Sequence, residues 1–215
     1  AGVCFGVKRA TDCVSALLRD PGVKKIYTLG ALIHNDTYLR DLERKGVRSI
    51  LATDAESIAK ESDTVGKTVL LIRAHGVPCT EEERLRALEV THPDFSVLDL
   101  TCPFVKRIHT IARENTNAGT RFILLGAPQH PECIGIMSYA RGEAAVFSSC
   151  RDIAAYLEEQ KNTPKPLIVA VQTTQSIAEW KKTQKYLKNL YTNAIFFDTI
   201  CNVTETRQQE ALALA

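Results

Sequence analysis

Three cysteines recur at nearly regular intervals along the chain. Cys4, Cys102 and Cys201 are separated by 98 and 99 residues, and a short apolar run precedes each of the last two. Three thiolates gathered in one place could bind a metal ion or an iron–sulfur cluster. They could equally be three unrelated structural cysteines, because a buried cysteine is a common core residue. The spacing alone does not decide between these two readings.

The number and spacing of the cysteines favour some kinds of site over others. Structural zinc sites usually have four ligands, often in C-x₂₋₄-C pairs, and this chain has no CxxC pair. A disulfide cannot join three thiols, and seven cysteines among 215 residues are too sparse for a secreted disulfide scaffold. A 4Fe–4S cluster normally takes four cysteines. Three would leave one iron able to bind a substrate oxygen as a Lewis acid.

The cysteines belong to a longer internal repeat. A Val-Lys-Arg string follows Cys4 and Cys102 at the same offset. His34 and His130 lie 30 and 28 positions after the two cysteines. At an offset of 71 positions come His75 and Thr173. Such agreement predicts copies of one structural unit. The expected units are 1–101, 102–200 and a truncated third unit, 201–215.

The elements that must position these residues follow from hydrophobic patterning. Apolar runs alternate with helical stretches, which indicates parallel sheets flanked by helices. Strands are expected at 24–30, 67–76, 96–100, 120–126, 144–148 and 166–172, with another apolar run before Cys201. Helices are expected at 35–46 with Asn35 as N-cap and Gly46 after the last turn, at 80–90 with Thr80 as N-cap, at 103–118 from Pro103, and at 176–190.

Nearly all of the candidate residues come directly after predicted strands. Ligands of open α/β sheets bind outside the carboxyl ends of the strands, so each unit would offer polar groups along one edge. Three units around a pseudo-threefold axis would bring these edges together. The predicted fold class is therefore an α/β trefoil of three small parallel-sheet units around a central site, with the third unit largely missing.

Composition excludes several classes of protein. Hydrophobic residues make up 45% and charged residues 24%, which is typical of a globular chain with a core. A net charge of +2 gives no bulk attraction to nucleic acid or membrane surfaces. No apolar run reaches the roughly 18 residues of a membrane helix. The chain begins inside a motif and stops inside a helical run, so we expect both ends to be missing.

Seven short strings together resemble one family. The strings are GVCFGVKRA, IHN (33–35), AHGV (74–77), DLTCPFV (99–105), HPE (130–132), QTT (172–174) and CNVTETRQ (201–208). They are similar, in order and over nearly the whole chain, to the 4-hydroxy-3-methylbut-2-enyl diphosphate reductase family of the non-mevalonate isoprenoid pathway. The chain departs from that family in lacking a strand before Cys4 and most of the third unit, which would carry Ser and Asn diphosphate contacts.

The resemblance implies a cofactor and a reaction. Cys4, Cys102 and Cys201 would hold a 4Fe–4S cluster whose open iron takes up the substrate hydroxyl. Two electrons and protons would then remove that hydroxyl, giving isopentenyl and dimethylallyl diphosphate. The electron donor would be ferredoxin or flavodoxin, with no nucleic-acid or membrane partner. The expected location is the cytoplasm, or the plastid if the source has plastids.

The resemblance also assigns individual residues. His34, His75 and His130 would line the cavity, mainly near the diphosphate, and His130 would also take part in catalysis. Glu132 would be the acid of the proton path and Thr173 would lie close to the substrate hydroxyl. Thr204 matches a family position near the cavity. Histidine suits a diphosphate because its charge changes near pH 7, and C–O cleavage requires an acid for the leaving oxygen.

Each assignment has a plainer structural alternative. His34 could be a helix-boundary residue, His75 could end a strand, Glu132 could stabilise a first helical turn, and Thr173 could cap helix 176–190. Cysteines outside the repeat are expected to be packing or surface thiols: Cys13, Cys79, Cys133 and Cys150. We expect His92 in a loop and His109 to serve packing or face solvent.

Two other functions remain open for the whole chain. A non-redox iron–sulfur hydro-lyase would use the same three cysteines without an electron donor. A zinc-binding or interaction module would show no broad absorption near 400 nm.

Overall fold

The computed structural model of the chain describes residues 3–161 and 165–214 and divides into two compact units. The first unit is Ala1–Pro103 and the second is Phe104–Ala215. This division lies close to the boundary expected after residue 101. The predicted third unit beginning at 201 stays a prediction, because the residues after Cys201 group with the second unit.

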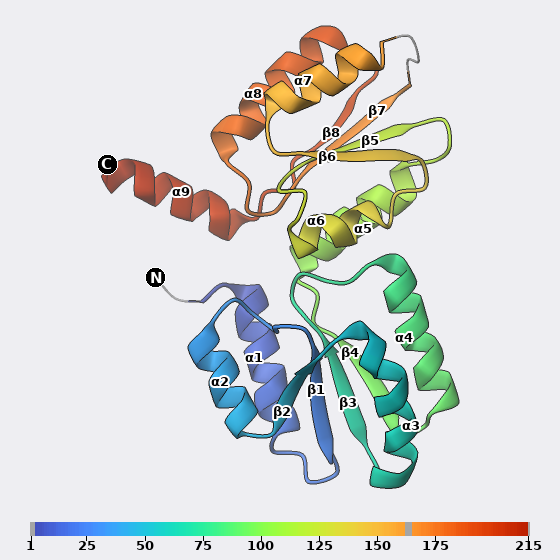
Figure 1. Ribbon diagram of the computed structural model, residues 1–215. Helices are drawn as coiled ribbons and strands as arrows, with labels where there is room; N and C mark the ends of the chain where they lie inside the picture. The colour runs from blue at the N-terminus through green and yellow to red at the C-terminus, as the bar shows by residue number, and fades with distance from the viewer. Residues whose placement is uncertain (1–2, 162–164, 215) are drawn as a thin grey trace. The chain divides into compact units, whose positions relative to one another are not determined.

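The first unit is a four-stranded parallel sheet covered by helices (Figure 1). Its strand order is β2-β1-β3-β4, and every neighbouring pair is parallel. The strands are β1 (Lys25–Leu29), β2 (Val47–Ile50), β3 (Thr68–Ile72) and β4 (Phe95–Asp99). The helices are α1 (Phe5–Leu17), α2 (Asp36–Arg44), the short 3₁₀ helix η1 (Ala52–Asp54), α3 (Ala55–Val65) and α4 (Cys79–Thr91).

Alternate side chains of these strands supply two hydrophobic layers. Leu70 on β3 packs with side chains of α3 and α4, whereas its neighbours Val69 and Leu71 pack with those of α1 and α2. All five residues of β3 are buried. A central parallel strand between two helical layers requires this continuous apolar run, which is why the sequence shows no alternation there.

The second unit repeats this topology with the strand order β6-β5-β7-β8, again all parallel. Figure 1 shows α7 and α8 on one face of the sheet and α5 and α6 on the other. The strands are β5 (Arg121–Leu125), β6 (Glu143–Phe147), β7 (Leu167–Val171) and β8 (Ile195–Phe197). The helices are α5 (Pro103–Asn115), α6 (Pro131–Met137), α7 (Cys150–Glu159), α8 (Ile177–Leu190) and α9 (Asn202–Leu214).

The repeat predicted from the cysteine spacing is visible in the backbone hydrogen bonds. Gly30 follows β1 and donates its N–H to the carbonyl of Ile50, the last residue of β2 (3.0 Å). Gly126 follows β5 and donates to Phe147, the last residue of β6 (2.8 Å). The predicted α/β class with parallel sheets is confirmed.

Several local predictions were wrong. β2 was not expected, because Arg48 and Ser49 in its middle are exposed and interrupt the apolar signal. Thr80 does not cap α4, which begins one residue earlier with Pro78 in the N-cap position. Helix α5 begins at Pro103 as expected but ends at Asn115, short of 118.

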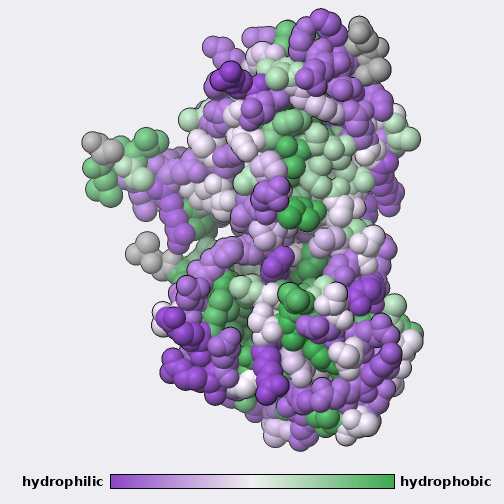
Figure 2. All heavy atoms as spheres, viewed as in Figure 1, coloured by the Kyte–Doolittle hydropathy of each residue, from purple (hydrophilic) through white to green (hydrophobic). Residues whose placement is uncertain are grey.

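The C-terminal helix α9 differs from the other long helices. None of its described residues is buried, whereas every other helix of nine or more residues buries at least one. Leu212 is 79% exposed, and Figure 2 shows a green, hydrophobic end on this helix. In the described part of the chain no helix combines the length and the apolar character that crossing a membrane requires.

Candidate functional site

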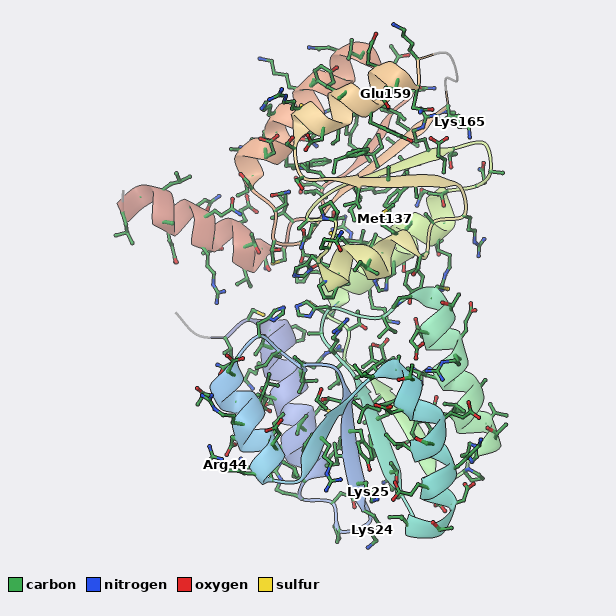
Figure 3. The ribbon with its side chains drawn as sticks, in the orientation of Figure 1. Lys24, Lys25, Arg44, Met137, Glu159 and Lys165 are labelled. Carbon is green, nitrogen blue, oxygen red and sulfur yellow. The ribbon has the colours of Figure 1, made fainter. Side chains whose placement is uncertain are left out.

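Cationic side chains mark the amino-terminal edges of the sheets. Figure 3 labels Lys24 and Lys25 at the start of β1 and Lys165 just before β7. Lys25 pairs with Glu61 and Lys165 with Glu143. The candidate functional residues all lie elsewhere, at the carboxyl ends of strands or in the first turns of the helices that follow.

In the first unit Cys102 occupies a turn after β4 that is fixed by its backbone. The Cys102 N–H donates to the carbonyl of Ala74, which follows β3 (2.9 Å). One residue earlier, both the N–H and the hydroxyl of Thr101 donate to the Asp99 carboxylate. These hydrogen bonds hold the backbone of Cys102 at the carboxyl edge of the sheet without involving its side chain.

Cys4 is the N-cap residue of α1 and lies near the same corner. Its backbone is extended, with ψ 164°, and its side chain is half-buried. A Cβ atom on Gly6, in the first turn of α1, would lie 2.9 Å from the Cys102 Sγ. Cys102 therefore touches the helical turn that Cys4 caps, and the first unit brings these two predicted ligands into one neighbourhood.

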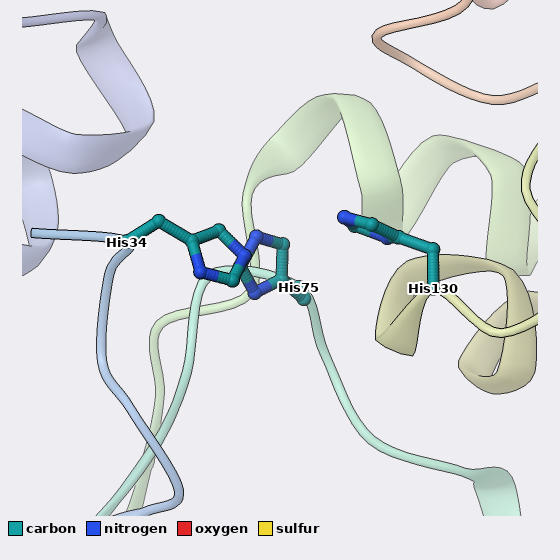
Figure 4. A group of neighbouring side chains, drawn as sticks. All are labelled: His34, His75 and His130. Carbon is teal, nitrogen blue, oxygen red and sulfur yellow. The ribbon is translucent and has the colours of Figure 1, made fainter.

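His34 and His75 follow the two central strands of the first sheet, β1 and β3. The chain crosses to opposite sides of the sheet from these strands, and α/β proteins bind ligands at such a switch point. The ring centroids of the two histidines are 4.6 Å apart with the rings tilted by 40° (Figure 4). His34 is exposed and His75 is half-buried, so both can reach a ligand.

The second unit places His130, Glu132 and Thr173 at the corresponding ends of β5 and β7. His130, drawn in Figure 4, is the N-cap of α6, and its Nδ1 accepts the N–H of Glu132 (3.1 Å). The Glu132 carboxylate accepts both the backbone N–H and the hydroxyl of Thr173, each at 2.9 Å. Thr173 therefore does not cap α8, whose cap is Ser176.

Glu132 is a buried carboxyl group with only 2% of its surface exposed. Burial raises its pKa because the charged form loses hydration, while the two hydrogen bonds from Thr173 act in the opposite direction. The net effect is a raised pKa. A carboxyl group that keeps its proton to higher pH can deliver it to a leaving oxygen.

Gln172 fixes the loop that carries His130, and the sequence reasoning assigned it no role. Its Oε1 accepts the N–H of Ala127 (2.9 Å), and the Ala127 carbonyl accepts the N–H of His130 (3.0 Å). A Cβ on Gly126 would lie only 2.7 Å from the Cys133 Sγ and 2.9 Å from Gln172. The signal available in the sequence was a polar residue at the end of the apolar run 166–172. The structure buries this glutamine, leaving 4% of its surface exposed.

Cys201 occupies the same kind of corner in the second unit as Cys102 does in the first. Its N–H donates to the carbonyl of Thr173 (3.0 Å), which joins the cysteine to the partner of Glu132. The Cys201 sulfur accepts the N–H of Thr204 at 3.4 Å and lies 3.1 Å from its hydroxyl oxygen. Thr204 was expected near the cavity, and the structure places it against the sulfur.

The three repeat cysteines fit a metal or cluster site by their local chemistry. Each is half-buried, lies at the N-terminus of a helix, and forms no disulfide in the described part of the chain. The N–H groups at a helix N-terminus stabilise a negatively charged sulfur. Gly6 has no side chain, which allows the Cys102 sulfur to lie against the first turn of α1.

The remaining cysteines and histidines have structural surroundings. Cys133 and Cys150 are buried, and Cys13 packs against a hydrophobic cluster. His109 is 3% exposed and stacks on Tyr139, with ring centroids 4.1 Å apart. His92 follows α4, and its Nδ1 lies 2.8 Å from a carboxylate oxygen of Asp63.

Known proteins share this sequence and this arrangement. The family described as LytB protein matches residues 1–215. A protein of Caldanaerobacter subterraneus subsp. tengcongensis is 34% identical over 217 residues, covering 100% of this chain and 69% of its own length. One of Thermoanaerobacter sp. is 37% identical over 211 residues, covering 98% and 68%. Both are named 4-hydroxy-3-methylbut-2-enyl diphosphate reductase.

Solved structures agree with the sequence relatives. A structure of (E)-4-hydroxy-3-methyl-but-2-enyl diphosphate reductase, described as the terminal enzyme of the non-mevalonate pathway, matches with 30% identity and a TM-score of 0.74. The match covers 97% of this chain and 68% of that one. A structure of the E-1-hydroxy-2-methyl-but-2-enyl-4-diphosphate reductase of Plasmodium falciparum matches with 25% identity and a TM-score of 0.77, covering 97% of this chain and 61% of that one.

The chain is an α/β protein in which two parallel-sheet units each carry polar groups at the carboxyl edge of the sheet. The chain belongs to the LytB family, whose matched members are oxidoreductases of isoprenoid biosynthesis. It spans about two thirds of most of these relatives, and 31% of a longer one from Clostridium acetobutylicum.

Proposed function

We propose that this chain carries most of the site of a 4-hydroxy-3-methylbut-2-enyl diphosphate reductase. The reaction consumes two electrons and two protons, breaks the allylic C–O bond, and releases water with isopentenyl or dimethylallyl diphosphate. Among the structural observations, the strongest support is the buried pair of Glu132 and Thr173 at the carboxyl edge of the second sheet. Membership of the LytB family supports the same reaction.

Cys4, Cys102 and Cys201 are the proposed ligands of a 4Fe–4S cluster. Such a cluster would pass on the two electrons one at a time from an electron donor, and its iron would act as a Lewis acid toward the substrate oxygen. The chain contributes thiol groups at helix N-termini, where backbone N–H groups favour negative charge. Thr204 donates to the Cys201 sulfur, which supports a role beside the ligand. Its contact with substrate stays a prediction.

Glu132 is the proposed proton donor for the leaving oxygen. Its raised pKa keeps a fraction of the carboxyl protonated at higher pH than for an exposed glutamate. The hydroxyl and N–H of Thr173 hold both carboxylate oxygens, so the acid has a defined orientation. His130 accepts a backbone hydrogen bond at Nδ1, so the proton of the neutral ring lies on Nε2.

His34 and His75 are the proposed diphosphate-binding groups of the first unit, and His130 is that of the second. Imidazole N–H groups donate to phosphate oxygens, and protonated rings add favourable charge. The pair of rings after β1 and β3 supports this role, because two tilted histidines offer several ring nitrogens at one edge. The proposed electron donor is a ferredoxin or a flavodoxin.

The test combines an acid variant with a hydroxyl variant. Glu132→Gln should reduce turnover by about 10²–10⁴-fold because the general acid is lost. Thr173→Val should also reduce turnover, whereas Thr173→Ser keeps the hydroxyl and should retain most of it. Products would be followed under anaerobic conditions with and without a chemical reductant. Glu114→Gln, on the exposed face of α5, is the matched control.

The same preparations separate the competing functions. Iron content and absorption near 400 nm should be equal in all four variants, because none is a proposed ligand. Substrate conversion without reductant would indicate a hydro-lyase, and a colourless protein that binds zinc would indicate a zinc module. A Cys102→Ser variant that retained the full chromophore would contradict the ligand assignment.

A further inference from the structure

Helix α1 makes two separate contacts with the corner that carries Cys102. It approaches the sulfur through Gly6 and the preceding backbone through Arg9. Cys4 caps the same helix, so these contacts also relate Cys4 to Cys102. All four residues belong to the first unit.

The first contact depends on the absence of a side chain at Gly6. This residue is buried in the first turn of α1, and a Cβ built on it would lie 2.9 Å from the Sγ and 3.4 Å from the Cβ of Cys102. Real Cβ atoms essentially never approach another heavy atom within 3.0 Å. Any larger residue would therefore displace either the Cys102 side chain or the helix.

The second contact is a hydrogen bond from Arg9 to the turn itself. The guanidinium Nη2 donates to the carbonyl oxygen of Thr101, the residue immediately before Cys102. The Nε of Arg9 is buried, and none of the described groups accepts a hydrogen bond from it. A buried unsatisfied donor is costly, so stability alone does not account for this arginine.

The internal repeat shows that these contacts are specific to the first corner. Phe104 takes the place of Gly6 at the same offset after Cys102, and Arg107 takes the place of Arg9. Arg107 is exposed, whereas Arg9 is half-buried. The Val-Lys-Arg string is therefore shared, but within residues 3–161 and 165–214 this hydrogen bond to a cysteine corner is seen for the first copy alone.

We propose that Gly6 and Arg9 are positioning residues that set the separation between the Cys4 and Cys102 sulfurs so that both can bind one cluster. This inference rests on the proposed function for its purpose, but its geometry concerns only the first unit. Gly6 allows the Cys102 sulfur to approach the first turn of α1. Arg9 prevents the turn after β4 from moving away from that helix.

The separation can be measured without any cluster. Dibromobimane joins two thiols that lie a few ångströms apart, and peptide mapping identifies the joined pair. In the metal-free, reduced wild-type chain we expect a Cys4–Cys102 bridge. Arg9→Ala should lower its yield by about tenfold, since one charge-assisted hydrogen bond is lost. Gly6→Ala should lower it at least as much. Arg9→Lys, which keeps a cationic donor, should restore part of the yield.

Matched controls distinguish positioning from general loss of structure. Arg107→Ala changes the repeat-equivalent arginine, and Gly22→Ala changes an exposed glycine of the same unit. Both should form the bridge as the wild type does. Circular dichroism and the melting temperature identify any variant that fails to fold. If Gly6→Ala does not fold, Arg9→Ala and Arg9→Lys still test the proposal.

Iron content after anaerobic reconstitution provides the second measurement. Arg9→Ala and Gly6→Ala should bind less iron than the two controls. If both variants form the bridge like the wild type, the positioning role is wrong whether or not iron binds. If the wild type forms the bridge and the variants do not, but no preparation binds iron, the positioning role holds and the proposed function fails.

Discussion

Opposing influences act on the single carboxyl group of Glu132. Burial favours its protonated form, and the two hydrogen bonds from Thr173 favour its charged form, with burial the larger of the two effects. A group in this balance is destabilising to the fold when it is ionised. The position of the buried Glu132 side chain, at the C-terminal ends of the strands, is consistent with a proton-transfer role.

The pH dependence of stability follows from this raised pKa. Below the ordinary value of 4.5, Glu132 is protonated in both the folded and the unfolded chain. As pH rises above 4.5, the unfolded chain ionises first, so stability falls until the folded pKa has been passed. Glutamine does not ionise, so the Glu132→Gln variant does not lose stability in this way. The variant should therefore gain unfolding free energy relative to the wild type as pH rises through that window.

Urea unfolding at several pH values measures the difference between the two chains. The Glu114→Gln variant, changed at an exposed position on α5, is measured alongside as the control. If the difference between Glu132→Gln and wild type stays constant from pH 4 to pH 8, the raised pKa of Glu132 is wrong.

At the residue scale the sequence selected candidate side chains, whose roles stay predictions, but it did not predict the contacts between them. The spacing and the short strings identified Glu132, Thr173 and the three cysteines. The contact between Glu132 and Thr173 joins residues 41 positions apart. It exists because β5 and β7 are neighbours in the sheet, and strand order is not encoded in any local pattern.

The starts of α2 and α4 show that the same capping signal can succeed or fail. Asn35 accepts the N–H of Tyr38 and caps α2 as predicted. Thr80 and Glu83 have capping-box spacing, but the helix begins at Cys79. Pro78 has φ −57° and ψ 150°, which places the entry of the chain before Thr80. Proline restricts its own φ, and this outweighs a side-chain cap further along the chain.

This difference predicts that one of two alanine substitutions lowers stability and that the other has almost no effect. Asn35→Ala should lower the unfolding free energy of the first unit by about 0.5–2 kcal/mol because a cap is lost. Thr80→Ala should change it by less than about 0.5 kcal/mol, because the residue lies inside a helix and caps nothing. Urea unfolding of both variants checks this. An equal cost for the two would indicate that Thr80 does act as a cap.

At the scale of the whole molecule, the described residues form two sheets, each with its own hydrophobic core. One pair of core clusters lies within the first unit, and another cluster lies within the second. The alternation of strands and helices was sufficient to predict both sheets. The third unit stays a prediction. The edge strand β2 was missed because it is short and carries exposed polar residues.

Core substitutions should therefore act within one unit at a time. Leu70 and Ile123 are both 0% exposed, on β3 and β5. Leu70→Ala should destabilise the first unit by about 2–5 kcal/mol, because a cavity is left in its core. Amide hydrogen exchange measured by mass spectrometry should then rise in β1 and β3 and remain unchanged in β5 and β7. Ile123→Ala should give the reverse pattern.

A uniform rise in exchange across all eight strands would instead indicate one cooperative folding unit.

The corners after β4 and β8 are both anchored through main-chain atoms. Cys102 donates its N–H to Ala74, and Cys201 donates its N–H to Thr173. A peptide N–H is present in every residue except proline. A substitution of the residue at such a corner, other than to proline, consequently keeps the backbone hydrogen bond and changes only the side chain presented there. Duplication of the unit would therefore give two turns with the same main-chain anchor, and the side chains at these turns could then diverge in function.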